Sequence, residues 1–557
     1  MAILTFACGC EFKTSSENSD DARQEIRKTL FRPDIGEIPL DCERTWDLIS
    51  SGNTKGCFQL ESRLGQSLAK KTRPRNIEEL AGLISIMRPG CMEAIVEGKS
   101  LTNHYIDRKH GRESVEYFHP ALERSLKETF GILVYQEQSM QIAQEIAGFN
   151  LQEADILRKA IGKKKTDVMA QVKTSFLQKA EEKGIVTKEQ AEEIFSWIEK
   201  SQRYSFNKSH AVSYAFNAYL SAYAKAHFSK EFFTSYLYYS KEKQKPHEEI
   251  NELVNNCRVM NIEIFPPDLR KSNKNFKIID EKIFFGLSNV KSVGQAVIDK
   301  IKRHKDEVEK TLNKEIDAWC WREFLVFFSD KITSTAVKAL ISVGAMSYMS
   351  SNRTKMLYEY ELFQKLTNKE KGWIQNHLLE NPDERDKEFL EILKHVVSLP
   401  TGKQGAVANK KRLESVKGMV MSLESPPYKL EDMPEWVAGK EEHLLGIPLT
   451  CSKVDACDTS SANAICKDVI NKNIKDYPLI AVQVDAVREI QIKNGPNRGA
   501  KMAFSTVSDY SCAIDCVIFS DAWEEYKNLL FEGNTVMING ELDRAKESFM
   551  IKKVWQI

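Results

Sequence analysis

The sequence lacks long hydrophobic runs and lacks net charge. None of its apolar stretches reaches about 18 residues, which argues against a transmembrane helix. The formal net charge of the 557 residues is +1, so a nucleic-acid partner can be argued only from local patches. The first residues, MAILTFACGCEF, lack a basic segment and hold too short an apolar core for a signal peptide.

A disulfide framework is also missing, because the 12 cysteines are scattered along the chain. This usage fits a reducing compartment, so we expect a cytoplasmic protein. Cys8 and Cys10 could supply two zinc ligands, with Cys42 or Cys57 as distant partners. Structural zinc sites usually combine two such pairs, and only one is present. Free thiols in a loosely ordered head are the alternative.

A third absence is a carboxylate cluster suited to Mg²⁺ beside the most distinctive segments. These segments read GILVYQEQ (131–138), ADILRKAIGKKK (154–165) and YSFNKSHAVSYA (204–215). Together they offer cations, a hydroxyl, an imidazole and a phenol, which are the groups that hold a triphosphate and a base. The segments therefore predict a nucleotide site that lacks metal ligands of its own.

The second segment places five cations within eight residues and no acid among them. They are Arg158, Lys159, Lys163, Lys164 and Lys165. Arg158 and Lys159 are predicted to close a helix that Gly162 breaks, and Thr166 to open the next helix. Arginine can fork two phosphate oxygens, and a helix N-terminus favours anions. The alternative is a solvated helix face, the usual role of a lysine run.

The third segment sets Lys208, Ser209 and His210 in a polar loop at the start of a buried helix, predicted over 211–228. Tyr214 follows His210 at i+4, so both side chains lie on one face. This pattern favours a nucleotide-binding surface. A satisfied core histidine is the alternative, and no acid stands at a spacing that suggests a hydrolytic triad.

The fold class is predicted to be multidomain, mainly α-helical, followed by a small all-β barrel of the OB type. The length favours about three to five domains. Apolar spacing predicts helices over 77–87, 136–147, 151–160, 166–183 and 188–200, the last with a capping box formed by Thr187 and Gln190. Residues 346–440 read as charged and irregular. Five alternating segments from 478 onward, with a helix over 523–530, predict the barrel.

Two further segments suggest contacts with DNA. A short hairpin over 276–287 leads into a helix-hairpin-helix pattern around Lys291, Val293 and Gly294, whose backbone N–H groups would face phosphate without reading sequence. A glycine turn in a helical pair is the alternative. The barrel could bind single strands through aromatic and basic side chains, or it could bind another protein.

Together these segments resemble the bacterial C-family replicative polymerase, the DNA polymerase III alpha family, over about 38–557. The matching segments are IPLDCERTWDLISSGNTKGCFQLES (38–62), MRPG (87–90), YIDRKHGRE (105–113), GILVYQEQSMQIA (131–143), ADILRKAIGKKK (154–165), FNKSHAVSYA (206–215), IFPPD (264–268), FFGLSNVKSVG (284–294) and HLLGIPL (443–449). Their order and spacing agree with that family.

The resemblance implies a domain order. Residues 1–37 are a leader without a counterpart and a candidate docking arm; 38–270 correspond to the fingers; 271–345 to the end of the fingers with the duplex-binding helix-hairpin-helix region; 346–477 to a connector; and 478–557 to the OB domain. It also implies that Arg158, Lys163, Lys208 and His210 fall on motifs lining the incoming-nucleotide site, with deoxynucleoside triphosphates as substrate and primer–template DNA as partner.

The palm of that family, with its metal-binding aspartates, has no counterpart here, so no catalytic residue is assigned. We expect a split polymerase in which a separate palm-bearing chain holds Mg²⁺, and we expect a bacteriophage source and action in the host cytoplasm. The family's clamp-binding pentapeptide is not evident between 346 and 440, which leaves a sliding clamp open as a partner. The alternative function is a non-enzymatic module that binds DNA or a host polymerase.

Overall fold

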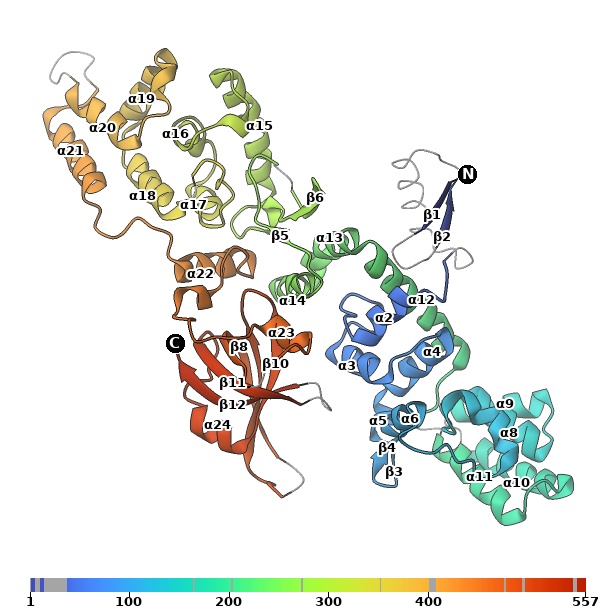
Figure 1. Ribbon diagram of the computed structural model, residues 1–557. Coiled ribbons are helices and arrows are strands. Elements are labelled where there is room, and N and C mark those ends of the chain that lie inside the picture. Colours follow the sequence, from blue (N-terminus) through green and yellow to red (C-terminus); the bar gives the residue numbers. More distant parts are fainter. Residues whose placement is uncertain are drawn as a thin grey trace. The chain divides into compact units, whose positions relative to one another are not determined.

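The structure is a computed structural model that describes residues 2–5, 11–14, 38–163, 166–201, 204–271, 274–350, 352–399, 407–474, 477–492, 496–543 and 548–557. The chain divides into two units, Met1–Phe232 and Phe233–Ile557, and Figure 1 labels their elements. In the head, β1 (Ala2–Thr5) pairs antiparallel with β2 (Glu11–Thr14). Cys8 and Cys10 lie outside the described residues.

The first unit contains a helical core built around two helices. Its elements are α2 (Glu43–Ser51), α3 (Arg63–Thr72), α4 (Ile77–Ile86), α5 (Pro89–Glu93), the hairpin β3 (Ile95–Val96) and β4 (Lys99–Ser100), α6 (Leu101–Lys109) and α12 (Lys208–His227). Helix α12 packs against α4 through buried Ala211, Ala215 and Ala218, whose small side chains let the two helices approach closely. We predicted a buried helix over 211–228, and in that range only Ser213 and Asn217 are exposed.

A second helical group of the first unit follows η1 (Pro120–Leu122), α7 (Glu123–Leu126) and η2 (Lys127–Thr129). It consists of α8 (Gln136–Ala147), α9 (Leu151–Lys163), α10 (Thr166–Lys183) and α11 (Lys188–Ser201), and its buried side chains form one cluster. These helices confirm the predicted spacing. The predicted capping box is confirmed as well, since Thr187 N donates to Gln190 Oε1 at 2.9 Å and Gln190 N donates to Thr187 Oγ1 at 3.2 Å.

The predicted break at Gly162 is wrong, because α9 continues to Lys163. Glycine inside a helix costs about 1 kcal/mol relative to alanine. Ala160 and Ile161 just before it are buried in the helical cluster, and this packing outweighs such a cost. Arg158 and Lys159 therefore lie within the helix rather than at its end.

The second unit begins within α13 (Ser229–Tyr239), which is followed by η3 (Ser240–Glu242) and α14 (Pro246–Val259). The predicted hairpin is confirmed as β6 (Lys277–Ile279) paired antiparallel with β7 (Lys282–Phe284). A third strand, β5 (Ile264–Phe265), adds to β7 in the parallel direction. This small sheet precedes the predicted helix-hairpin-helix segment.

The next part of the second unit is helical. Its elements are η4 (Leu287–Asn289), α15 (Gln295–Leu312), η5 (Ile316–Ala318), α16 (Trp321–Glu323), η6 (Phe324–Phe328), η7 (Ser329–Lys331), α17 (Ser334–Ser342), α18 (Arg353–Gln364), α19 (Asn368–Glu380), η8 (Pro382–Glu384), α20 (Phe389–Ser398), α21 (Lys410–Glu424) and α22 (Pro434–Leu445). Our prediction that 346–440 is irregular is wrong. Frequent charges hid the helical spacing of buried residues such as Ile374 and Leu378 in α19 and Leu393 in α20.

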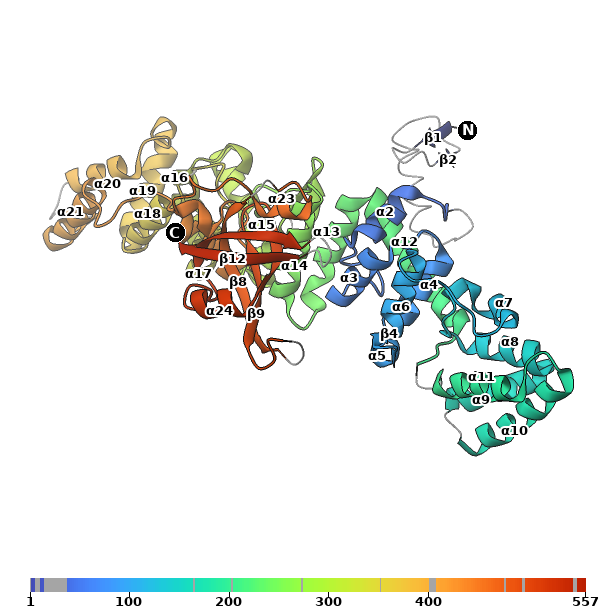
Figure 2. The ribbon, with the colours of Figure 1, turned by 60° about the horizontal axis from the view of Figure 1, so that its bottom comes forward.

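The chain ends in a closed five-stranded barrel, which confirms the predicted fold class (Figures 1 and 2). After η9 (Lys453–Ala456) and α23 (Cys466–Ile470), the barrel is formed by β8 (Leu479–Gln491), β9 (Lys501–Ser508), β10 (Ala513–Ile518), β11 (Thr535–Asp543) and β12 (Ser548–Gln556). The strand order β10-β12-β11-β8-β9, with β10 and β12 parallel, is typical of an OB fold. Helix α24 (Ser520–Tyr526) starts three residues before the predicted helix and lies against β9.

Gly540 marks a bulge where β11 passes β12 closely. The register shifts between Asn539 and Gly540, and a Cβ atom at Gly540 would lie 2.2 Å from the carbonyl oxygen of Met550. Only glycine fits such an approach.

Among the described helices of the chain, none combines the length and apolarity needed to cross a bilayer.

Candidate functional site

Two of the three distinctive segments meet in the first unit. Tyr135 and Phe206 form a parallel bridge, in which Gln136 N donates to Phe206 O at 2.9 Å and Phe206 N donates to Val134 O at 2.9 Å. The helical segment between Tyr135 and Phe206 therefore begins and ends at this bridge. The bridge brings the start of α8 to the start of α12, so side chains from 131–138 and 204–214 share one surface.

The N-terminus of α12 is held by an acidic residue that the sequence analysis missed. Asn207 caps the helix, its Oδ1 accepting from His210 N at 2.8 Å. Glu137 accepts from Asn207 Nδ2 and from Lys208 N, both at 2.8 Å, so it places negative charge at the positive end of the helix dipole. One indication of this role was present in the sequence: Glu137 lies within the distinctive segment GILVYQEQ (131–138).

The side chain of Lys208 is directed toward a second acid. Its Nζ forms an ion pair with Glu128 and lies 6.0 Å from the ring centroid of Tyr135. The Glu128 side chain is 56% exposed, and exposed pairs of this kind contribute only about 0–1 kcal/mol. A polyphosphate arriving at this surface could displace Glu128 from Lys208 at small cost.

A row of rings runs along the exposed face at the start of α12. The ring of His210 contacts that of Tyr214 at a centroid separation of 4.0 Å and an interplanar angle of 42°, which confirms their predicted position on one face. Phe206 meets His210 edge-on at 5.3 Å, and Phe58 extends the row from Tyr214 at 5.1 Å. On Phe206 the guanidinium of Arg88, from the segment MRPG, lies 3.6 Å from the ring centroid. Ser209 and His210 are exposed, so the row can be reached from solvent.

The cations of α9 are less free than their sequence suggests. Arg158 Nη2 lies 2.8 Å from Asp155 Oδ1, and Lys159 Nζ lies 2.7 Å from Asp155 Oδ2. Hydrogen bonds from Lys159 and Arg158 lower the pKa of Asp155. The acid lies three residues before the run that we described as free of acids. The side chain of Lys163 and all of Lys164 and Lys165 lie outside the described residues.

The end of α9 nevertheless returns toward the bridge between Tyr135 and Phe206. Helices α8 and α9 pack together and are joined by only three residues, 148–150. Such a short connection makes neighbouring helices antiparallel, so the C-terminal half of α9 lies beside the N-terminal half of α8. None of the described contacts of Arg158 or Lys159 joins them to 204–214.

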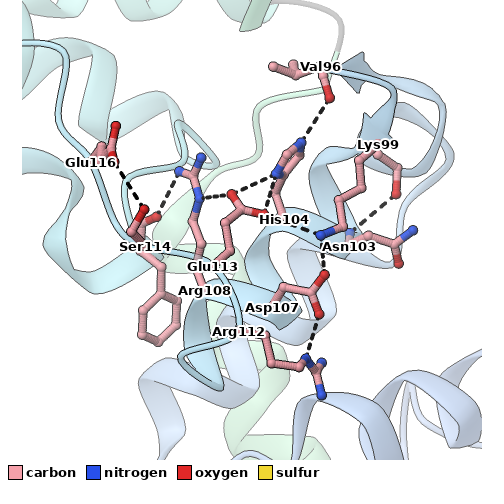
Figure 3. Close-up of polar contacts among 12 residues, drawn as sticks. Val96, Lys99, Asn103, His104, Asp107, Arg108, Arg112, Glu113, Ser114 and Glu116 are labelled. Carbon is pink, nitrogen blue, oxygen red and sulfur yellow. Dashed lines mark hydrogen bonds and ion pairs between the residues drawn. The ribbon is translucent and has the colours of Figure 1, made fainter. Parts of the chain in front are cut away.

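Figure 3 shows an ionic network on α6 and its flanking segments, which includes part of YIDRKHGRE (105–113). His104 Nδ1 lies 2.8 and 2.9 Å from the two carboxylate oxygens of Glu113, and its Nε2 lies 2.9 Å from Val96 O. Both partners accept, so the ring satisfies both only when each nitrogen carries a proton. Arg108 donates from Nε to Glu113 at 2.6 Å and from Nη1 to Phe130 O at 3.2 Å.

This network predicts a pH-dependent stability of the first unit. Burial alone would raise the pKa of Glu113, but hydrogen bonds from Arg108, His104 and Lys99 outweigh it and lower the pKa from 4.5 to about 2. Because the folded pKa lies below the unfolded one, the stabilisation is complete above about pH 4.5 and is lost as pH falls toward about 2.

Urea unfolding at several pH values between about 5 and 3 would measure this loss. Glu113→Gln should reduce the dependence, because the amide does not titrate. Glu116→Gln is the matched control: Glu116 accepts only from Ser114 in Figure 3, at 3.1 Å, and the dependence should persist. An unchanged dependence in Glu113→Gln would contradict the assignment.

The turn predicted at Val293 and Gly294 is wrong in position, because the turn before α15 lies at Lys291 and Ser292. The only helix before it in this segment is η4, a single turn. Gly294 caps α15 with φ −83°, which any residue can adopt, whereas Ser292 has φ 75°. The strained position is therefore Ser292. Val293 is buried, and Lys291 is exposed while its N–H donates to Leu444 O at 2.9 Å.

The barrel offers a stacking residue that the sequence could not select. Phe504 on β9 is 45% exposed, and its register partners are Arg488 on β8 and Val517 on β10. Arg488 is exposed as well. An exposed ring beside an arginine is the usual means by which such barrels bind successive bases.

Two of the zinc candidates, Cys42 and Cys57, lie among the described residues, and both are buried. Cys42 is buried, with its Sγ 3.2 Å from Nε2 of His227. Burial, with a smaller contribution from Arg44, lowers the pKa of His227 to about 4, so its ring is neutral near pH 7. Zinc at the head stays a prediction.

Comparison with known proteins identifies three domain models that match parts of the chain. Residues 19–184 match the bacterial DNA polymerase III alpha subunit finger domain, 261–356 a helix-hairpin-helix motif, and 479–553 an OB-fold nucleic acid binding domain. The chain is 33% identical to DNA polymerase III subunit alpha of Aquifex aeolicus over 553 residues, which cover 96% of this chain and 41% of that protein.

Two other relatives match the chain with similar identity and coverage. The subunit alpha of Borreliella burgdorferi is 32% identical, covering 94% of this chain and 42% of the relative, and that of Thermus aquaticus is 29% identical, covering 97% and 40%. The chain thus spans about two fifths of the length of these relatives. It is similar along almost its whole length to bacterial DNA polymerase III alpha subunits, and parts of it match models of their finger domain, of a helix-hairpin-helix motif and of an OB fold.

Proposed function

We propose that the chain supplies the nucleotide-binding fingers and the DNA-binding modules of a DNA-directed DNA polymerase. The observation that carries this proposal is the bridge between Tyr135 and Phe206, which places an accessible ring row and a cation at the start of α12. The homology to polymerase alpha subunits supports it. Deoxynucleoside triphosphates and primer–template DNA are the proposed ligands.

Each part of the surface has a proposed role. The rings of His210 and Tyr214 stack on the incoming nucleotide, and Ser209 offers it a hydroxyl. Lys208, the α9 cations Arg158, Lys159 and Lys163, and Lys164, which lies outside the described residues, neutralise phosphate charge. Charge-assisted contacts to phosphate strengthen as negative charge develops in the transition state, so these cations would raise the rate as well as the affinity.

The residues near this surface do not fit a Mg²⁺ site. Among the described carboxylates here, Glu137 is hydrogen-bonded to Asn207 and to the N-terminus of α12, and Glu128 is paired with Lys208. The proposal therefore assigns the metal-binding aspartates to a separate palm-bearing polypeptide and attributes no metal step to this chain. A bacteriophage source, action in the bacterial cytoplasm and contact with a sliding clamp are finer parts of the same proposal.

Primer extension tests the proposal against a non-enzymatic replication module. The purified chain should not extend a primer alone and should do so when mixed with a palm-bearing polypeptide. A variant with Lys208→Ala and His210→Ala should abolish extension in the mixture while it leaves DNA binding in place. Extension by the chain alone would contradict the separate palm, and a mixture unaffected by the double variant would favour the non-enzymatic module.

The loop before α15 gives a test of duplex binding. A Cβ at Gly294 would meet no atom within 4 Å, so Gly294→Ala should keep both the fold and duplex affinity. Gly294→Trp should hold the DNA backbone away and weaken duplex binding of all sequences alike, by about tenfold or 1.4 kcal/mol. Fluorescence anisotropy with two unrelated duplexes at low and moderate salt would measure this.

The outcome at Gly294 can also exclude the assignment. If duplex affinity hardly changes with salt, the contacts are not to phosphate and the region serves packing. If the tryptophan variant weakens only one of the two duplexes, base readout rather than backbone contact is involved.

Phe504 gives the corresponding test for single strands. Phe504→Ala should weaken binding of single-stranded DNA by about 1–3 kcal/mol, the contribution of one base stacked on an aromatic ring. The matched control is Phe531→Ala, since Phe531 is also exposed but lies after α24 and outside the strands. If both substitutions weaken single-stranded DNA binding equally, Phe504 on β9 has no specific role in that binding.

A further inference from the structure

A cluster of two imidazoles and one carboxylate in the second unit takes no part in the proposed function. His377 lies in α19, Glu384 in η8 and His395 in α20. One ligand atom from each lies within 4.8 Å of the other two. His377 Nε2 is 2.9 Å from Glu384 Oε2, and the rings of His377 and His395 lie 4.5 Å apart.

The distances are close to those that a metal requires. Zn²⁺ binds imidazole nitrogen at about 2.0–2.1 Å and carboxylate oxygen at about 2.0–2.2 Å, so neighbouring ligands of a tetrahedral ion stand about 3.3 Å apart. His377 and Glu384 already meet this spacing. His395 is exposed, and rotation of its side chain can bring its nitrogen the remaining distance.

The surrounding structure holds the ligands in place. Ile374 and Leu378 are fully buried beside His377 in α19, as is Leu393 beside His395 in α20. Trp373 stacks on His377 at 4.8 Å with an interplanar angle of 10°, and it lies 5.3 Å from His395. The ring of Trp373 therefore forms a wall shared by both imidazoles.

The turn that carries Glu384 is fixed at its next residue. Arg385 Nε donates to Leu378 O at 2.9 Å, and Arg385 O accepts from Arg322 Nε at 2.8 Å. The carboxylate is thus presented to α19 by a turn anchored on both sides. Preorganisation of this kind is what distinguishes a metal site from two histidines that happen to be near each other.

The remaining contacts of the ligands are compatible with a bound ion. Lys387 Nζ donates to Glu384 Oε1 at 2.8 Å and leaves Oε2 on the side of His377. Nδ1 of His377 is 3.4 Å from Asn381 Nδ2, which also donates to His377 O at 2.9 Å.

We propose that His377, Glu384 and His395 bind a divalent transition metal, best Zn²⁺, which fastens α20 and its preceding turn to α19. Two imidazole nitrogens favour zinc over magnesium or calcium, which prefer oxygen ligands. Three protein ligands leave a fourth position for water. The proposal does not depend on the polymerase assignment.

Zinc binding to the full chain tests this proposal. Cys8 and Cys10 are first replaced by serine, because thiols in the head could bind zinc themselves. After removal of metal with a chelator, calorimetry should show one Zn²⁺ bound per chain. Co²⁺ should give the strong visible absorption of a four-coordinate ion instead of the weak absorption of a hydrated one.

Substitutions locate the site. His395→Ala should lower zinc affinity by about 10–100-fold or more, and Glu384→Gln should lower it to a smaller degree. His395 is exposed, so its removal should leave the fold intact by circular dichroism. The matched control is His304→Ala, which removes another histidine paired with a glutamate, His304 Nδ1 to Glu307 Oε2 at 2.7 Å, but without a third ligand.

The zinc-binding measurements either support or overturn the proposed site. Zinc affinity retained in His304→Ala and lost in His395→Ala supports the site. Absence of zinc uptake overturns the proposal, and so does uptake that His395→Ala leaves unchanged. The cluster would then be an ion pair beside stacked rings.

Discussion

Replacing Arg158 with alanine should lower nucleotide incorporation by the reconstituted polymerase by about 10²-fold or more, because a charge-assisted phosphate contact strengthens in the transition state. The substitution should not destabilise the fold. The described ion pair of Arg158 is with Asp155 three residues earlier, and pairs on a helix surface contribute only about 0.3–0.5 kcal/mol. Asp155 would keep Lys159 as a partner.

Lys173→Ala is the matched control for Arg158. Lys173 pairs with Glu199 at 3.2 Å with a similarly exposed side chain, in the same helical group but outside the proposed surface. Its removal should leave incorporation unchanged. Single-turnover kinetics across nucleotide concentrations separate the rate from the affinity. If Arg158→Ala changes neither, Arg158 belongs to a solvated helix face.

Replacing Glu441 with alanine should destabilise the second unit by about 3–5 kcal/mol, the usual effect of breaking a buried ion pair. Glu441 is fully buried and accepts from Arg353 Nη1 at 2.8 Å. It also accepts from Leu449 N at 2.6 Å and from Thr450 N and Oγ1 at 2.9 and 2.6 Å. Its removal strands the buried Arg353 charge and frees the chain after α22.

An exposed pair provides the control for Glu441. Glu361 and Lys338 are 2.7 Å apart with side chains 48% and 45% exposed, so Glu361→Ala should cost at most about 1 kcal/mol. Urea unfolding of both variants measures the difference. A loss below about 1 kcal/mol in Glu441→Ala would show that the network around Arg353 rearranges instead of remaining unpaired.

The sequence predicted those parts of the fold that local spacing determines. The helices α8, α10 and α11, the capping box at Thr187 and the strands of the barrel follow from periodicity and local hydrogen bonds. The contact between the rings of His210 and Tyr214 also follows, because i+4 residues share a helix face. The charged helices between 346 and 440 did not, because their buried residues are spread among many charges.

The candidate site could be predicted only in part. The residues of the segment 204–214 were identified, but their environment depends on long-range contacts that periodicity does not contain. Glu137 reaches the start of α12 only because the backbone bridges Tyr135 and Phe206. At the loop before α15 the sequence pointed to Gly294, whereas the left-handed conformation falls on Ser292, a residue type that gives no such signal.

Photoaffinity labelling tests the central claim most directly. The full chain, bound to primer–template DNA, would be exposed to a photoreactive deoxynucleoside triphosphate, and the labelled peptides mapped by mass spectrometry. We expect labels within residues 204–216 and around Arg88, removed by excess unlabelled nucleotide. Labelling confined to other peptides, or labelling that nucleotide does not compete away, would contradict the assignment of this surface to the incoming nucleotide.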